Sequence, residues 1–329
     1  MFTRITTIFT VSIICLGLTN ATWAAKAKDK GGKGEKGEEA SGKGMNNYNA
    51  GNTAFEQKNY PQAIAEYSRA IDLNPKQPAF YQNRGFALLA MERLDEALTD
   101  FNQAIEMGSK DSRVYIGRGQ IYLKQQVFDM AEADANKALE LKPDDPSAHQ
   151  IRGFANAGLQ QWDKAVADFT AAIQRNPNDW QNYDQRALAY RKLKDYQHAI
   201  EDYNVAIEKN PNTAGGGMGS QAMEYARRGY TYSEMREYEK AIPDFQMALK
   251  LDPNDADTPM RLQYAQSQLA AKNAPPPKLE PAATPAPEST KLLTPLNIVL
   301  GLVVLGIIAA VIRLITRGKA EPTSSMRIR

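Results

Sequence analysis

An alanine recurs along this chain at a spacing of 34 residues, and this period restricts the fold more than any other feature of the sequence. Each alanine stands in a similar stretch, of which "KNYPQAIAEYSRAIDLNP" at 58–75 is the first. The copies place it at Ala63, Ala97, Ala131, Ala165, Ala199 and, after a longer step, Ala241. In a chain of 329 residues, such a period indicates a stack of repeated units rather than separate domains.

Each unit has the apolar spacing of two helices, each of roughly a dozen residues. A small residue lies twelve positions before each alanine, where two helix backbones can approach closely: Gly51, Gly85, Gly119, Gly153, Ala187 and Gly229. A second alanine follows the first by seven residues, and in five units an aromatic residue lies between them: Tyr67, Phe101, Phe169, Tyr203 and Phe245. Proline cannot continue a helix, and it ends most units: Pro75, Pro143, Pro177, Pro211 and Pro253.

This pattern resembles the tetratricopeptide repeat family, whose 34-residue unit carries the same small, alanine, aromatic and proline positions. The resemblance covers roughly two thirds of the chain and implies an all-α fold, a right-handed α-solenoid. It would contain six helix-turn-helix repeats and a C-terminal capping helix. The predicted repeats are 45–77, 78–111, 112–145, 146–179, 180–213 and 222–255, and the cap is 258–271.

In this family the first helices of the repeats line a concave groove that receives peptides or helices of partner proteins. The resemblance therefore implies a protein or peptide partner for this chain. The candidate groove residues are Tyr48, Asn52, Gln82, Asn83, Phe86, Arg113, Gln120, Lys124, Phe154, Arg191, Arg227 and Tyr230. The same face would also carry Phe55, Leu89, Ile116, Gln150, Asp184 and Leu188. Alternatively, Phe86, Phe154 and Leu188 point inward and pack between helices, which leaves the groove polar.

One branch of the family grips an acidic C-terminal carboxylate with five residues from three repeats. At those positions this chain keeps Asn52 and Asn83, has Arg113 in place of a lysine, and differs at Tyr48 and Gly117. The carboxylate clamp is therefore incomplete. The mixture of amides, apolar residues and cations instead suits an extended or helical peptide with some acidic character.

Five units carry an arginine immediately before the small residue of the first helix: Arg84, Arg118, Arg152, Arg186 and Arg228. Such regular recurrence favours a structural role over a ligand site. We expect these arginines to stack on aromatic rings or to pair with neighbouring acids.

Groups that could support catalysis are sparse. His149 and His198 fall in different units and on different predicted helices, which indicates neither a metal site nor a base–nucleophile pair. Cys15, the single cysteine, lies in the N-terminal apolar stretch. Residues 45–272 carry 26 Lys and Arg against 31 Asp and Glu, a net charge of −5 that matches a nucleic-acid binder poorly. We expect no enzyme activity, no cofactor, no metal and no nucleic-acid partner.

The period is interrupted once, because the step from Ala199 to Ala241 is 42 residues instead of 34. The surplus of eight residues falls within "NTAGGGMGS" at 212–220. A tolerated loop insertion explains it, since longer loops add little closure entropy. The alternatives are a hinge for the sixth unit or a contact with a partner.

The two ends of the chain are apolar. The N-terminal run is too short to span a bilayer comfortably, which favours a signal peptide at 1–25 over an uncleaved anchor, and a Lys- and Gly-rich leader follows at 26–44. A Pro-rich linker at 273–291 precedes a predicted transmembrane helix at 292–316. The final residues, 317–329, are basic, and by the positive-inside rule this indicates a cytoplasmic tail.

Together these features predict a single-pass protein of the cell membrane, with extracytoplasmic (periplasmic or extracellular) repeats and a cytoplasmic tail. Its function would be that of an interaction scaffold or adaptor, in the assembly of an envelope or secretion complex. Two alternatives stay open. One is a tail-anchored, co-chaperone-like docking protein with cytoplasmic repeats, and the other is a spacer that self-associates end to end.

Overall fold

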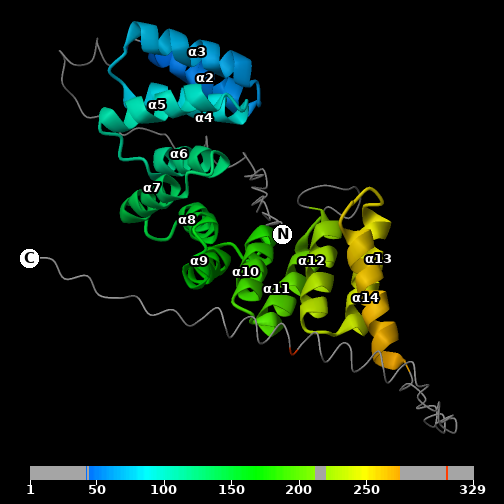
Figure 1. Ribbon diagram of the computed structural model, residues 1–329. Coiled ribbons are helices and arrows are strands. Elements are labelled where there is room, and N and C mark those ends of the chain that lie inside the picture. The colour runs from blue at the N-terminus through cyan, green and yellow to red at the C-terminus, as the bar shows by residue number, and fades with distance from the viewer. Residues whose placement is uncertain (1–41, 43, 212–219, 275–308, 310–329) are drawn as a thin grey trace, which may run out of the picture. The chain divides into compact units, whose positions relative to one another are not determined.

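The computed structural model describes residues 42, 44–211, 220–274 and 309, and these residues contain thirteen helices and no strand. The first helices of the six predicted units are α2 (Met45–Glu56), α4 (Pro78–Ala90), α6 (Ser112–Lys124), α8 (Pro146–Gly158), α10 (Trp180–Lys192) and α12 (Gln221–Glu234). The second helices are α3 (Tyr60–Leu73), α5 (Leu94–Glu106), α7 (Phe128–Leu141), α9 (Trp162–Arg175), α11 (Tyr196–Lys209) and α13 (Tyr238–Leu251), and α14 (Thr258–Asn273) follows them. The all-α solenoid predicted from the period is confirmed (Figure 1).

Several predicted segments lie outside the described residues, apart from single positions at their edges or within them. They are the signal peptide at 1–25, the leader at 26–44, the linker at 273–291, the transmembrane helix at 292–316, the tail at 317–329 and most of the insertion at 212–220. Among the helices that the structure does describe, none has the length and apolar character that a membrane span requires.

The helices α2 to α14 belong to one compact unit, in which helices that follow one another in the chain pack together. First helices of neighbouring units also contact one another, as α4 and α6 do. No contact of similar extent links neighbouring second helices within the described residues. The first helices therefore lie on the inner side of the stack, as expected for a groove.

Local sequence signals set the ends of these helices. The side chains of Asp111, Asp145 and Asp179 each accept a hydrogen bond from the backbone N–H two residues later, which caps the N-termini of α6, α8 and α10. Proline occupies the first turn of α4 and α8, where its missing N–H costs no helical hydrogen bond.

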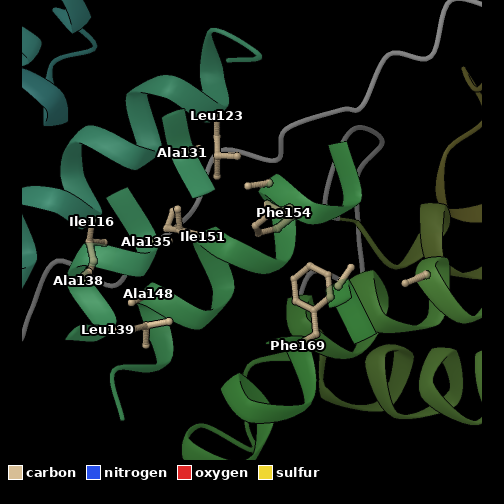
Figure 2. Close-up of a cluster of buried hydrophobic side chains, with 13 residues drawn as sticks. Ile116, Leu123, Ala131, Ala135, Ala138, Leu139, Ala148, Ile151, Phe154 and Phe169 are labelled. Atoms are coloured by element: carbon tan, nitrogen blue, oxygen red, sulfur yellow. The ribbon is translucent and has the colours of Figure 1, made fainter. Parts of the chain in front are cut away.

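The 34-residue period reflects one contact that is repeated in the core. The recurring alanine of each second helix is fully buried, and the following aromatic residue is at most 1% exposed in each of the five units that have one. The aromatic ring faces the small residue of the first helix, so that a Cβ added to Gly153 would lie 2.8 Å from the ring of Phe169. Figure 2 shows Phe169 within a cluster of buried side chains, most of them from the third and fourth units. A larger residue at the glycine position would force this ring out of its site.

The five recurring arginines pair with buried aspartates sixteen residues later. Arg118 is representative, since its Nε and Nη2 atoms donate to the two carboxylate oxygens of Asp134 at 2.8 and 2.6 Å. The other four pairs are Arg84–Asp100, Arg152–Asp168, Arg186–Asp202 and Arg228–Asp244. Each pair joins the first helix of a unit to its own second helix, which confirms the structural interpretation of the arginines. We call this set the arginine ladder.

The arginine ladder also connects neighbouring units. The remaining Nη1 atom of Arg118 donates to Asn102 in the preceding second helix at 2.7 Å, and its guanidinium lies 6.0 and 5.8 Å from the rings of Tyr115 and Tyr122. Equivalent hydrogen bonds run from the other four arginines to Ser68, Asn136, Thr170 and Asn204. Arginine suits this position because one planar group can serve two helices and stack on aromatic rings at once.

Candidate peptide-binding surface

Side chains of α2, α3 and α4 form a hydrogen-bonded cluster in the first two units, here called the amide cluster: Tyr48, Asn52, Tyr67 and Asn83. The Asn83 amide donates to the Tyr48 hydroxyl at 3.0 Å and to Asn52 Oδ1 at 2.9 Å. The Tyr67 hydroxyl donates to the same Asn52 oxygen at 2.8 Å. Tyr48 is buried, which raises the pKa of its hydroxyl, whereas the two asparagines are half-buried. The amide cluster therefore ties α2 to α4 and leaves only the asparagines within reach of a ligand.

Gln82 and Arg113 meet at the N-terminus of α6. The buried Gln82 amide donates to Asp111 Oδ2 at 2.6 Å, and Arg113 Nε donates to the same oxygen at 2.9 Å. Burial acts to raise the pKa of Asp111, but the hydrogen bonds and charge of Arg113 outweigh it and hold that pKa below its usual range. Gln82 thus supports a helix end instead of facing the groove, and the charge of Arg113 is balanced within the fold.

The aromatic candidates differ in their exposure. Phe154 is 5% exposed and packs edge to face against Phe169, with ring centroids 5.4 Å apart (Figure 2). Phe154 is therefore a core residue, as the inward alternative expected, and its assignment to an accessible groove is corrected. Phe86 packs in the same way on Phe101, with ring centroids 5.0 Å apart, but it is only half-buried. Leu188 is also half-buried.

The third unit contributes two of the remaining candidates. Gln120 is half-buried on α6, on the inner side of the stack. The Lys124 ammonium donates to Glu92 Oε1 at 3.1 Å, which links the end of α6 to the turn after α4. Of the two, Gln120 is the side chain better placed to meet a partner, because Lys124 already has an ionic contact.

Arg227 belongs to a buried polar cluster between the fifth and sixth units. Its Nη1 atom pairs with Asp184, which is 1% exposed and also accepts a hydrogen bond from Gln185. Glu224, likewise 1% exposed, accepts a hydrogen bond from the Asn210 amide at 2.8 Å. Burial, followed by the nearby charge of Asp184, raises the pKa of Glu224 to about 8. Arg227 neutralises Asp184 inside the stack, so this candidate cation is not directed at a peptide.

Arg191 and Tyr230 lie beside a pocket that extends to the last helix. The pocket has a volume of about 560 Å³ and is lined by residues of α12, α13, α14 and the adjoining turns: Tyr230, Ser233, Glu234, Arg236, Tyr238, Phe245, Asp257, Met260, Arg261 and Tyr264. We call it the end pocket. Arg191 and Arg261 both place their guanidinium carbons near the centre of the Tyr230 ring, at 4.7 and 4.4 Å. Arg191 is further held by Glu234 at 3.2 Å.

The groove residues predicted from the sequence include none on α14, which was predicted as a capping helix that resembles a lone first helix. A signal was present, since Tyr264 follows Tyr230 by 34 residues and Arg261 follows Arg227 by the same step. The helix packs on α12 and α13 through the buried Ala265, and Figure 1 shows the three helices side by side. The last helix thus continues the series of first helices and extends their surface by one position.

Family models described as tetratricopeptide repeats match residues 51–92, 83–146, 180–213 and 222–255. The repeats in these segments are tetratricopeptide repeats. The tetratricopeptide repeat (TPR) fold is in general a non-catalytic scaffold that mediates protein–protein interactions. Among the described residues, no group of three or more His, Cys, Asp or Glu side chains is placed to hold a metal ion.

Individual relatives agree with the TPR assignment. The TPR repeat-containing thioredoxin TTL4 of Arabidopsis thaliana is 48% identical over 46 residues, which are 14% of this chain and 7% of that protein. The crystal structure of YrrB, a TPR protein with an unusual peptide-binding site, superposes with a TM-score of 0.51 at 21% identity, covering 61% of this chain and 97% of YrrB. A chain of the APC/C hetero-tetramer Cut9-Hcn1 superposes with a TM-score of 0.55 at 17% identity, covering 68% of this chain and 43% of that chain. The structural similarities show the fold alone.

Proposed function

We propose that this chain is an adaptor that binds a peptide segment of a partner protein along its first helices. The observation that carries the proposal is the end pocket, because aromatic and charged side chains from three helices surround a space of about 560 Å³. Pockets of this size with a few polar groups are typical of ligand sites. The peptide-binding site described for YrrB, a protein of the same fold, is consistent with this function.

A cross-linking experiment tests which side of the stack meets the partner. A photoreactive amino acid is introduced into the full chain at Gln120, on the first helix α6, or at the exposed Gln174, on the second helix α9. Irradiation of cells that express each variant is expected to give covalent adducts with another protein from position 120 and none from position 174. Adducts from position 174 alone would contradict the proposal. Both positions begin as glutamine, which matches the two variants chemically.

This design avoids the structural roles of the other candidates. Asn83 makes two hydrogen bonds in the amide cluster, and Arg113 pairs with a helix-capping aspartate. Alanine at either position would weaken the fold as well as any contact with a partner. A loss of binding in such a variant would therefore be ambiguous.

We further propose that the repeats are displayed outside the cytoplasm by a membrane anchor and assist the assembly of an envelope or secretion complex. The support is the sequence: an apolar stretch at 296–315, a basic tail after it and a proline-rich segment before it. Proline-rich sequences favour extended conformations, so this segment would hold the repeats away from the bilayer.

Protease accessibility tests this topology. Protease added to intact cells or spheroplasts is expected to degrade the repeats, while an epitope fused after Arg329 stays protected. Repeats that survive until the membrane is broken would instead support the alternative with cytoplasmic repeats. A cytoplasmic marker protein measured in the same samples shows whether the cells stayed intact.

A further inference from the structure

The end pocket contains arginines whose charge is not balanced by an ion pair. Arg261 and Arg236 both line it, and neither forms an ion pair with any residue that the structure describes. The acid Glu234 is already engaged with Arg191. Asp257 is then the remaining carboxylate in the lining, so the end pocket holds more unpaired positive than negative charge.

Asp255, an acid close to Arg261, is engaged at the start of α14. Asp255 accepts hydrogen bonds from the backbone N–H of Asp257 at 2.9 Å and from the Thr258 hydroxyl. The positive charge of Arg261 contributes to a lowered pKa of Asp255, although burial acts in the opposite direction and the hydrogen bonds contribute more than the charge. Asp255 is therefore occupied by hydrogen bonds at the start of α14, and Arg261 forms no ion pair with a carboxylate among the described residues.

Arg261 is positioned as a recognition group would be. Its guanidinium carbon lies 4.4 Å from the centre of the Tyr230 ring, which fixes the side chain by a cation–π contact. A guanidinium held in this way can still donate hydrogen bonds from its edge, and the geometry of those donors matches a carboxylate. The electrostatic preference of the end pocket is therefore for an acidic group.

Apolar surface lies beside this cation. Met260 and Tyr264, both on α14, are 66% and 54% exposed, although each lines the end pocket. Tyr264 also packs edge to face on Tyr238, with centroids 6.3 Å apart. An aromatic or large aliphatic side chain of a ligand would remove this surface from water.

We propose that the end pocket binds a partner peptide in which an acidic residue adjoins an aromatic or large aliphatic residue. The carboxylate accepts hydrogen bonds from Arg261, and the apolar side chain packs between Tyr264, Met260 and Tyr230. This inference rests on the proposed peptide-binding function and names the ligand chemistry of one part of the surface.

Selection from a random heptapeptide library on the purified full chain tests this proposal without a known partner. The peptides that bind are expected to be enriched at least tenfold in Asp or Glu next to an aromatic or large aliphatic residue. That enrichment is expected to disappear with Arg261→Gln and to persist with Arg93→Gln, which alters an exposed ion pair on α5. A circular dichroism spectrum and a melting temperature like those of the parent establish that Arg261→Gln is folded.

A second variant keeps the test decisive if Arg261→Gln is unstable. Met260→Asp changes a side chain that is 66% exposed, and the new carboxylate should repel an acidic peptide and abolish the enrichment. Enrichment of basic or purely apolar peptides, no enrichment at all, or enrichment unchanged in both variants would overturn the proposal. A second copy of the chain as the occupant, seen as a dimer by light scattering and lost in Met260→Asp, would overturn it too.

The cross-linking result separates this inference from the proposed function. Adducts from position 120 without acidic enrichment in the library would refute the ligand chemistry of the end pocket alone. Acidic enrichment that depends on Arg261, with no adducts from position 120, would instead move the binding surface to the end of the stack. Failure of both experiments would refute both proposals.

Discussion

Replacing Arg118 with alanine is expected to lower the free energy of unfolding by about 3–5 kcal/mol. The substitution removes three hydrogen bonds at once, two to Asp134 and one to Asn102. It also leaves the carboxylate of Asp134, which is only 4% exposed, without its counter-ion. A buried charge without a partner accounts for most of the expected loss. Urea denaturation of the full chain, followed by circular dichroism, measures it.

The matched control is Arg93→Ala, which removes another arginine that pairs with a carboxylate. Arg93 bonds Glu96 on the surface of α5, where the two side chains are 43% and 58% exposed. Surface pairs of this kind contribute little to stability, so the unfolding midpoint should not change measurably. Equal effects of Arg118→Ala and Arg93→Ala would mean that the arginine ladder does not stabilise the stack.

The free energy of unfolding of the parent protein is expected to fall as the pH rises. Replacing Glu224 with glutamine is expected to abolish this fall. The pKa of Glu224 is about 8 in the folded chain and is ordinarily 4.5, so the folded state binds a proton that the unfolded state releases. Stability therefore falls between these two pKa values, by roughly 2–3 kcal/mol between pH 6 and pH 8. Glutamine carries no titrating proton and keeps an amide oxygen that can accept the hydrogen bond from Asn210.

Denaturation of parent and Glu224→Gln at pH 6, 7 and 8 measures this difference. The stability advantage of the variant should grow with pH, and it should level off above the folded pKa of about 8. Glu208→Gln, at an exposed position of α11, serves as the control and should follow the parent. Parallel curves for parent and Glu224→Gln would show that Glu224 is ionised in the folded chain at neutral pH.

The repeat architecture could be predicted from the sequence, but the contacts between repeats could be predicted only in part. The 34-residue spacing predicted the helix pairs because burial of alanine against an aromatic ring, as at Ala165 and Phe169, must recur with the unit. Recurrence also indicated that Arg118 is structural. It did not reveal that Asp134 and Asn102 are its partners, since both lie sixteen residues away on different helices. That pairing depends on how helices of neighbouring units are aligned.

The candidate surface was harder to predict for a related reason. Position within the repeat indicates which side of a helix a residue occupies, and this placed Asn52, Asn83 and Tyr230 where a ligand could reach them. It does not indicate whether a neighbouring side chain takes up the polar group, as Asp111 does for Gln82, or covers the ring, as happens to Phe154. Such outcomes depend on residues from two or three units together.

One hydrogen bond of the arginine ladder has a consequence for engineering the chain. In the sixth unit Arg228 donates to Asn204 at 2.7 Å, 24 residues earlier, whereas the other ladder arginines reach back sixteen residues. The eight surplus residues therefore leave this link between the fifth and sixth units intact. Foreign sequence, such as an affinity tag or a fluorescent protein, should accordingly be accepted between Pro211 and Ser220 without loss of the native stack.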